Sequence, residues 1–368
     1  MHVEATLGTT TSFSGSYDAE DVTFLLKPVH MPTTRIADKE AAIQSGRRHY
    51  SEMIAPELLP SDRYLSLYHA ALARNGDRLA ADVAALAGHL AIRRPGREIV
   101  IVSLARAGTP IGVLLVRTLR SWGHAAHHYS ISIVRDRGID QVALAHIAER
   151  HDPADAVFVD GWTGKGAIAG ELRRSLADHP HGFVPLLAVV ADPAGQADIA
   201  SSGEDYLIAS GLLNGIVSGL VSRSILNDRC VGIGDFHACV TYPQYAAADL
   251  SRAFVDSLAP RAAAAVPRTI DDHAARRPSL AADCATMLSN ISAWAGTHDL
   301  NRIKPGIAEA TRALLRRVPE RVLVRDPCDE DVAHIAQLAD EAGLRVDRLD
   351  PNSNYRAITI IRTLGNER

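Results

Sequence analysis

The amino-acid sequence predicts an α/β protein, in which a parallel sheet with helices on both faces is followed by a small second α/β domain. Strand-like and helix-like segments alternate between residues 98 and 190, an order typical of a doubly wound parallel sheet. Two of the strands, 99–102 and 157–159, are continuously apolar, as strands buried on both faces are. A stretch rich in proline and alanine at 259–280 indicates a linker before the second domain.

Length and composition are those of a globular chain with more than one core. The chain has 368 residues, of which 47% are hydrophobic and 22% charged. Its formal net charge of −4 argues against a protein that coats nucleic acid. Residues 1–11 lack the pattern of a signal peptide, and no apolar run approaches the roughly 20 residues of a membrane span. The four cysteines show no metal-binding spacing, so we expect a cytoplasmic protein with reduced thiols and no membrane partner.

The first 97 residues are expected to cover the sheet. Residues 1–60 are irregular and polar, apart from the apolar segment Val22–Leu26, and would form a surface wrap or a lid over a pocket. Ser61 is the predicted N-cap of a helix that breaks at Asn75-Gly76, and a second helix would then run to about Ile92. Apolar stripes on both helices predict packing against the sheet.

The strands and helices that follow are predicted in turn along the chain. The strands are 99–102, 125–134, 157–160 and 184–190, and the helices between them are 109–122, 140–150 and 164–177. Weaker signals indicate a short element at 206–208 and helices at 217–226 and 244–258. The second domain would hold helices at 305–318 and 329–342 with strands at 321–325 and 357–362.

The loop after the third strand carries the clearest functional signal. Asp160 ends an apolar strand, and the glycine-rich segment 161–166 leads into a helix. Such a loop directs backbone N–H groups and a helix N-terminus at one point, which suits a phosphate. It is not a Walker A motif, because Val159 stands where the first glycine belongs and Gly166 replaces the Ser/Thr. The acid at the strand end indicates a ligand with hydroxyl groups beside a phosphate, such as a sugar phosphate.

A second loop of this kind follows the first strand, in residues 103–110. Arg106 lies among small residues, where its fork of donors suits bidentate phosphate binding. Thr109 and Pro110 are the expected N-cap and first residue of the next helix. An ordinary capped loop without a ligand would have the same sequence features. The prediction of a phosphate site therefore depends on both loops lying at the same edge of one sheet.

Two further pairs of residues are candidates for catalysis. Arg135 and Arg137 would close over a polyphosphate as a mobile loop, although a solvated charged turn has the same composition. Asp235 and His237 stand two residues apart, so in a strand they would share one face and could supply a general base. A buried hydrogen-bonded pair is the alternative.

These residues carry a family resemblance. The order of a small loop, a basic loop and an acid-and-glycine loop resembles type I phosphoribosyltransferases. More closely, residues 103–112, 128–140, 158–168, 218–222 and 235–237 are similar to the StiP family, which is found beside tellurium-resistance-type gene clusters and has been treated as a phosphoribosyltransferase domain. The resemblance covers residues 12–258, the linker is 259–280, and residues 281–368 resemble a Pelota-type RNA-binding domain.

The resemblance implies a type I phosphoribosyltransferase-like enzyme that uses phosphoribosyl pyrophosphate and Mg²⁺ on an unidentified acceptor and releases pyrophosphate. Asp160 would bind the ribose hydroxyls, the loop around Lys165 the 5-phosphate, and the loop around Arg106 the pyrophosphate. Gly161 departs from the family pattern, which has a second acid there. The substrate-binding residues so implied are Ser103, Ala105, Arg106, Ala107, Gly108, Thr109, Gly161, Thr163, Gly164, Lys165, Gly166 and Ala167.

Two other classes of function stay open. The StiP family has also been labelled a cysteine protease, and Cys239 shares a predicted strand face with His237. The chain could instead be a non-catalytic RNA-binding protein, because the second domain has a basic side. A homodimer is expected as the commonest assembly. The basic residues of that side are Arg302, Lys304, Arg312, Arg316, Arg317, Arg321 and Arg325.

Overall fold

The computed structural model describes residues 12–364, apart from the side chains of residues 271 and 272. Six parallel strands form the central sheet in the order β1, β4, β3, β7, β8, β9. Residues 1–11, where no signal peptide is expected, and residues 365–368 of the second domain lie outside the described range. The strands are β1 (Thr23–Leu25), β4 (Ala126–Ile131), β3 (Ile99–Leu104), β7 (Ala156–Trp162), β8 (Leu187–Ala191) and β9 (Ile199–Ser202).

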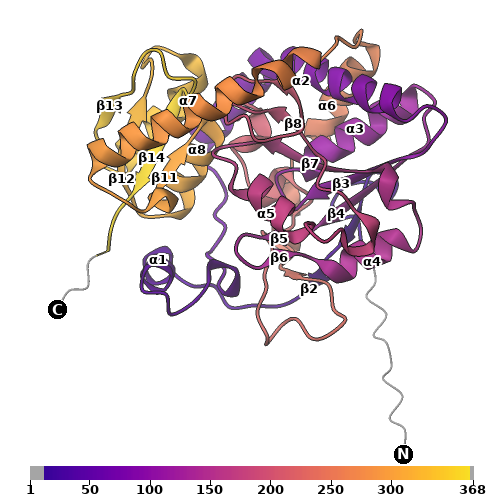
Figure 1. The fold of residues 1–368 in the computed structure, drawn as a ribbon. Coiled ribbons are helices and arrows are strands. Elements are labelled where there is room, and N and C mark those ends of the chain that lie inside the picture. The colour runs from indigo at the N-terminus through magenta and orange to yellow at the C-terminus, as the bar shows by residue number, and fades with distance from the viewer. Residues whose placement is uncertain (1–11, 365–368) are drawn as a thin grey trace, which may run out of the picture.

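Helices cover both faces of this sheet (Figure 1). The helices α2 (Asp62–Arg93), α3 (Thr109–Ser121) and α6 (Ser251–Ala264) pack together on one face. The helices α4 (Gln141–Ala148) and α5 (Ala167–Ser175) lie on the other. Alternate side chains of β3 enter the two cores: Ile99 and Ile101 join one cluster, and Val100 and Val102 the other. This explains why the strand is apolar at every position.

The second unit is a four-stranded sheet in the order β11, β14, β12, β13. Its strands are β11 (Ile303–Pro305), β14 (Ala357–Ile361), β12 (Pro319–Val324) and β13 (Val346–Arg348), and its helices are α7 (Asp271–Ala295), α8 (Ile307–Arg316) and α9 (Ala333–Glu341). Helix α7 spans both units and contacts β9 of the first sheet and β11 of the second (Figure 1). The predicted fold class, a helix-covered parallel sheet followed by a small α/β unit, is confirmed.

The short element predicted at 206–208 is irregular chain, and two larger predicted features of the first unit are also wrong. No break occurs at Asn75-Gly76, because α2 is one helix of 32 residues that begins at the predicted cap Ser61. Gly76 lies against α6, where a Cβ would come within 3.1 Å of an Arg261 side-chain nitrogen. The helix expected at 217–226 is mostly irregular chain, because Val221 and Ile225 form β-bridges with Thr241 and Ala238. In both places tertiary contacts override local preference.

Residues 259–280, the expected linker, contain the end of α6, a short connection at 265–270 and the first part of α7.

The remaining helix and strands are small. They are α1 (Ile36–Gln44), the parallel pair β2 (Lys27–Pro28) and β10 (Ala238–Cys239), and the hairpin β5 (Ile133–Val134) and β6 (Gly138–Ile139). Within residues 12–364, none of the helices combines the length and apolar character that crossing a membrane requires.

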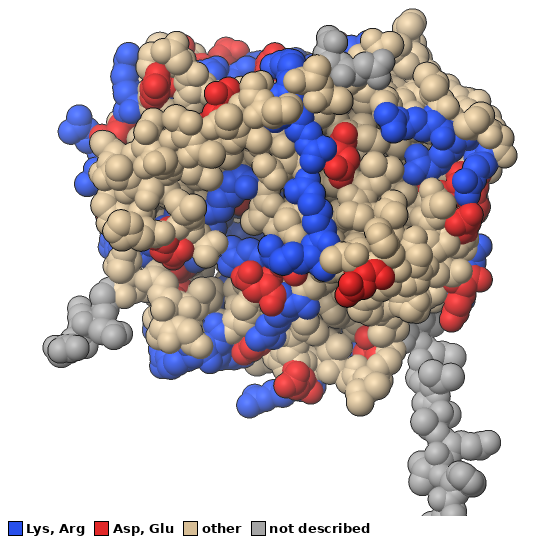
Figure 2. Space-filling model, in the orientation of Figure 1, with Lys and Arg blue, Asp and Glu red and all other residues tan. Residues whose placement is uncertain are grey.

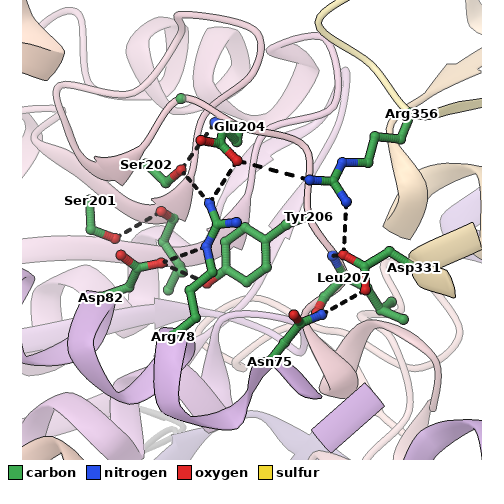
Figure 3. A network of polar contacts seen from close by, with 12 residues as sticks. Asn75, Arg78, Asp82, Ser201, Ser202, Glu204, Tyr206, Leu207, Asp331 and Arg356 are labelled. Carbon is green, nitrogen blue, oxygen red and sulfur yellow. Dashed lines mark hydrogen bonds and ion pairs between the residues drawn. The ribbon is translucent and has the colours of Figure 1, made fainter. Parts of the chain in front are cut away.

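Buried carboxylates join the two units. Asp331, next to α9, accepts hydrogen bonds from Asn75 of α2 at 2.9 Å and from Arg356 at 3.0 Å (Figure 3). Asp205 accepts the backbone N–H groups of Ile307, at 2.9 Å, and of Arg356, at 2.8 Å. Because an unpaired buried charge is costly, these contacts hold the second unit in a defined position on the first.

Candidate ligand-binding site

The two predicted loops leave the same edge of the central sheet. Strands β3 and β7 are parallel neighbours, with Val102 opposite Phe158 and Ser103 opposite Val159. The loop after β3 packs against the end of β7: a Cβ at Gly161 would lie 3.7 Å from the carbonyl oxygen of Ala107, and a Cβ at Gly108 only 2.3 Å from that of Val159. Only glycine allows so close an approach at this position. The sequence-predicted pair of loops is therefore one structural site.

A cavity of about 570 Å³ lies at this edge and is lined by both units. The first unit contributes the loop around Lys165, and the second contributes β11 and α8. In Figure 2, lysine and arginine side chains gather in a band along the middle of the face on which both units are seen. The cationic residues that line the cavity are Arg106, Arg135, Lys165, Arg223, Arg302, Lys304, Arg312, Arg316 and Arg317, against the acids Glu40, Asp160, Asp299 and Glu309.

The loop of residues 163–167 has free donors. In the described chain, the amide N–H groups of Gly164, Lys165, Gly166 and Ala167 have no hydrogen-bond acceptor within the protein. Gly166 has φ +83° and precedes α5, which places the N-terminus of that helix at the loop. Four unsatisfied amides at a helix N-terminus form an anion site in the usual sense.

Other groups of this loop are already bound. The Thr163 hydroxyl donates to the buried carboxylate of Asp192, so it supports the loop from behind. The Lys165 ammonium donates to the carbonyls of Leu300 and Ile303 in the second unit. Burial lowers the pKa of Lys165 to about 8. In the described chain both hydrogen-bond acceptors of the ammonium are backbone carbonyls, with no carboxylate in ion-pair contact. The Lys165 side chain lies on the cavity wall.

Asp160 is the strand-end acid of the cavity. One carboxylate oxygen accepts the N–H of Gly161 at 2.8 Å. Burial raises the pKa of Asp160 to about 7, although the Gly161 N–H and the positive charge of Arg312 act in the opposite direction. A carboxyl group with this pKa can accept or release a proton at neutral pH, which suits it to acid–base work.

The loop around Arg106 differs from the prediction. The Arg106 guanidinium is buried in an ion pair with Glu57 at 2.9 Å and donates to the carbonyl of Val221 at 2.6 Å. Although burial acts against it, the charge of Arg106 lowers the pKa of Glu57. The guanidinium is thus neutralised within the protein. The backbone of Ala105 and Ala107, with a cis peptide bond between Ala105 and Arg106, also lines the cavity.

Ser103 and Thr109, two predicted residues of this loop, lie outside the cavity wall and support the loop from behind. Ser103 contacts His128 at 2.8 Å, and the Thr109 hydroxyl contacts that of Ser130 at 2.8 Å. The N-cap of α3 is Gly108, so the expected cap at Thr109 is wrong. Thr109 is the first helical residue, and its hydroxyl binds across to β4 instead.

The structure does not bring the two predicted catalytic pairs, Arg135 with Arg137 and Asp235 with His237, together at the cavity. Arg135 lines the cavity and donates to Asn301 of the second unit at 3.2 Å. Arg137 turns to Glu52 and Leu226, beside a different surface recess. Asp235 pairs with Lys27 at 2.7 Å, and His237 contacts Ser132 at 2.7 Å. Neither lines the cavity, so the structure does not bring this candidate general base to the site.

The arginines of α8 were missed as site residues, because their sequence context indicated a basic surface for RNA. Arg312 and Arg316 line the cavity, and the Arg312 guanidinium lies over the ring of Trp162, 4.5 Å from its centroid. In the described chain Arg312 Nε and Arg316 Nη2 are buried without a hydrogen-bond acceptor. Their spacing of four residues puts them on one helix face, which is the signal the sequence offered.

The cysteines of the described chain are not arranged for catalysis. Cys239 is fully buried, and burial raises the pKa of its thiol to about 12. Cys284 is also buried and contacts the Tyr355 hydroxyl at 3.1 Å, while Cys328 is exposed. No thiol of the described residues forms a hydrogen bond with a histidine. A nucleophilic thiolate next to a base is thus not present in this arrangement.

The acids of the cavity can be compared with the ligands that magnesium requires. Within residues 12–364, three potential metal ligands, Glu98, His127 and His151, lie close together, but they are outside the cavity. Mg²⁺ is usually held by one or two carboxylates together with substrate phosphates. Asp160 and Glu309 line the cavity, and the charge of Glu309 contributes to the raised pKa of Asp160. These residues fit that mode of binding.

Comparison with known families matches both units. The model of the family described as "Tellurite-like stress resistance cysteine protease StiP" matches residues 15–259, and that of the "PELOTA RNA binding domain" matches residues 283–363. A curated relative from Acinetobacter baylyi, named cysteine protease StiP, is 43% identical over an alignment of 369 positions that covers 96% of this chain and 95% of the relative. Both resemblances expected from the sequence are confirmed.

Solved structures with a similar fold include two phosphoribosyltransferases. One is a hypoxanthine phosphoribosyltransferase variant from Trypanosoma cruzi complexed with IMP, with 12% identity, a TM-score of 0.28, and coverage of 50% of this chain and 90% of that chain. The other is the HGPRT-ase from Leishmania tarentolae in complex with GMP, with 14% identity, a TM-score of 0.23, and coverage of 40% and 80%. At these TM-scores neither structure decides the activity of this chain.

Proposed function

The chain belongs to the StiP family, and we propose that this member is a phosphoribosyltransferase-type enzyme. Its ligand is phosphoribosyl pyrophosphate or a related ribosyl phosphate. The observation that carries the proposal is the combination of free amides at residues 164–167, a cation-lined cavity, and the carboxyl group of Asp160 at the strand end. The amides and cations suit phosphates, and the carboxylate suits ribose hydroxyls.

In the proposed reaction, the bond between C1 of the ribose and the pyrophosphate oxygen breaks. The electron pair leaves with pyrophosphate, and a nucleophilic atom of the acceptor forms the new bond to C1 and gives up its proton. Positive charge develops on the ribose and negative charge on the leaving group. Cations fixed in a cavity stabilise that negative charge without having to reorganise, which is the usual source of large electrostatic effects in catalysis.

Each part of the cavity has a role in this proposal. The amides of residues 164–167 bind the 5-phosphate, and Asp160 binds the ribose hydroxyls. The Arg106 guanidinium is held by Glu57, so this loop would contribute the backbone of Ala105 and Ala107. Arg135, at the cavity wall, would approach the leaving group.

Magnesium, if bound with the diphosphate, would be held by Asp160 and Glu309 and would neutralise part of the charge on the leaving group. The acceptor and its general base are not assigned, because Asp235 and His237 lie outside the cavity.

Calorimetric titration with phosphoribosyl pyrophosphate and Mg²⁺ tests this function. Wild type is expected to bind, and Asp160→Asn and Lys165→Met are expected to bind at least ten-fold more weakly. Asp178→Asn, at an exposed position outside the cavity, serves as a matched control and should bind as wild type does. The absence of binding to wild type, or equal binding by all variants, would remove the assignment.

A cysteine protease is the second candidate, because the curated relative carries that name. Cys239 is the thiol that the sequence favoured as the nucleophile of a protease. It is buried, and its raised pKa keeps it protonated at neutral pH. A protease would therefore need a rearrangement that exposes this thiol to a base. Cys239→Ala separates the two candidates: peptide hydrolysis would disappear in a protease, whereas binding of the ribosyl phosphate would survive in a transferase.

RNA binding by the second unit is supported by the match to the PELOTA RNA binding domain. Filter binding of a structured RNA to the full chain, measured over a range of salt concentrations, tests it. Binding that weakens steeply with salt is the expected signature of phosphate contacts. The homodimer stays a prediction, and sedimentation of the free protein would test it.

A further inference from the structure

We propose that Arg312 and Arg316 of helix α8 bind the diphosphate end of the ligand, so that the second unit forms part of the binding pocket. The inference rests on the proposed function for the identity of the ligand, but its central claim is narrower. It states that a diphosphate group binds where the second unit meets the loops of the first. In this arrangement the arginines of α8 face a small anionic ligand instead of an RNA surface.

The geometry of α8 places these arginines in the cavity. The helix spans Ile307–Arg316 and buries Ile307, Ala310 and Ala313. Arg312 and Arg316 are one helical turn apart and line the cavity. Gly164 of the anion loop lies directly under the helix, because a Cβ there would be 2.7 Å from the Glu309 side chain. Helix α8 and the amide loop are therefore adjacent walls of one space.

Each of the two arginines has a buried donor atom without a hydrogen-bond acceptor in the described chain. In the described chain Arg316 has no carboxylate within salt-bridge distance, and its buried Nη2 has no acceptor. The buried Nε of Arg312 also lacks an acceptor, while its Nη1 reaches the Glu309 carboxylate only at 4.0 Å, a long ion pair. Arg223 Nη1, on the same wall, is a third such donor. Buried donors are almost always satisfied, so three at one cavity indicate a missing acceptor.

The electrostatics of the wall support the same conclusion. Burial, together with the charges of Arg106 and Arg312, lowers the pKa of Arg316 well below its ordinary value. Burial and the nearby charge of Lys165 lower the pKa of Lys304 to about 7. Like charges held this close repel one another, and a polyanion between them would relieve the repulsion.

The helix is held in place by contacts that do not involve a ligand. Asp205 of the first unit accepts the N–H of Ile307, the first residue of α8. The ring of Trp162 lies beneath the Arg312 guanidinium. The contacts of Asp331 fix the adjoining face of the second unit (Figure 3). The arginines are thus preorganised, which lowers the entropic cost of binding an anion.

The test uses the full chain and two probes, inorganic pyrophosphate and phosphoribosyl pyrophosphate, in calorimetric titrations. Arg312→Met and Arg316→Met are expected to bind pyrophosphate at least ten-fold more weakly than wild type. Arg345→Met is the matched control, because this arginine belongs to the same unit and its side chain is 90% exposed. Arg316→Lys, which keeps a charge, is expected to recover part of the affinity.

Thermal unfolding without ligand provides the readout that separates binding from structure. Removal of an unpaired buried charge is expected to leave the melting temperature of Arg316→Met unchanged or higher. A lower melting temperature together with unchanged pyrophosphate affinity would mean a structural role and would overturn the inference. So would a wild-type chain that binds no pyrophosphate, or variants that bind it normally but lose a structured RNA in filter binding.

The two proposals fail separately. If pyrophosphate binds wild type and is lost in the Arg312 and Arg316 variants, but phosphoribosyl pyrophosphate neither binds nor reacts, the inference stands and the proposed function falls. If phosphoribosyl pyrophosphate binds and all arginine variants bind pyrophosphate as wild type does, the proposed function stands and the inference falls.

Discussion

The guanidinium group of Arg312 lies 4.5 Å from the centroid of the Trp162 ring, although one residue belongs to α8 and the other ends β7. This contact orients a cation of the second unit, whose buried Nε has no acceptor in the described chain, over the strand that carries Asp160. A cation–π contact of this kind is worth roughly 0.5–2 kcal/mol. The ring is therefore a positioning group for Arg312.

Replacement of Trp162 by leucine is expected to weaken pyrophosphate binding by roughly two- to thirty-fold, which corresponds to the loss of one cation–π contact. Calorimetric titration measures the change. Trp294→Leu is the control, because that ring is exposed and lies beneath Arg321 instead. An equal effect of both substitutions would contradict the role given to Trp162.

Affinity for pyrophosphate is expected to fall as the pH rises from about 7 to 9. In the free protein burial lowers the pKa of Lys304 to about 7 and that of Lys165 to about 8. A bound anion raises both values, so binding takes up protons over this range and weakens as the ammonium groups lose theirs. Titration in buffers of different ionisation enthalpy measures the uptake. Lys304→Met should reduce it, and a pH-independent affinity would contradict the prediction.

Asp160→Asn is expected to stabilise the free protein at pH 8 while it weakens ligand binding. The pKa of Asp160 is raised to about 7, so between pH 4 and 7 the folded state binds more protons than the unfolded state. Stability contributed by this group is therefore lost as the pH rises through that window. The asparagine variant should gain roughly 1–3 kcal/mol in unfolding free energy at pH 8 and little at pH 4. Urea unfolding at both pH values measures this, and a loss of stability at pH 8 would contradict it.

Thiol labelling of the native protein is expected to be selective. Cys328 is exposed and should react first, whereas Cys239 and Cys284 are buried, and burial raises the pKa of both thiols. These two should react only after unfolding, because the thiolate is the reactive form. Alkylation followed by mass spectrometry identifies the labelled positions. Rapid labelling of Cys239 in the native protein would favour the protease instead.

Loss of the Asp331 carboxylate is expected to loosen the second unit. Asp331→Ala leaves Arg356 and Asn75 without their shared acceptor, and loss of a buried ionic partner typically costs roughly 3–5 kcal/mol. Pyrophosphate binding should weaken as well, because α8 loses part of its support. Glu330→Ala is the control: this neighbouring acid pairs with Arg74, which also pairs with Asp331 at 3.3 Å, but the Glu330 side chain is 73% exposed and should contribute less than about 1 kcal/mol. Chemical denaturation of the two variants measures the difference.

Several elements could be predicted because their signal is local. The apolar run 157–159 followed by an acid and glycines predicted a buried strand and a loop, and both are present. Gly76 misled the prediction, because a glycine in a helix pattern looks like a break until the neighbouring helix is known. Strand β9 was missed because its pairing with β8 depends on a partner that the sequence does not name.

Site residues, too, could be predicted only where the signal is local in the sequence. The position of Asp160 and the loop after it depended only on local order. The partner of Arg106 did not, since Glu57 comes from a distant segment and neutralises the guanidinium. Arg312 and Arg316 have the spacing of a basic helix face, and no local feature says what that face meets.

The sequence by itself determined the parallel sheet, the small second unit and the loop after Asp160, because periodicity, glycine and strand-end acids act over a few neighbouring residues. Tertiary structure alone decided which cations share a cavity, because that depends on how buried carboxylates such as Asp331 and Asp205 dock one unit on the other. Charge is a property of each residue, but whether a charge is paired or left unsatisfied depends on the neighbours that folding brings to it.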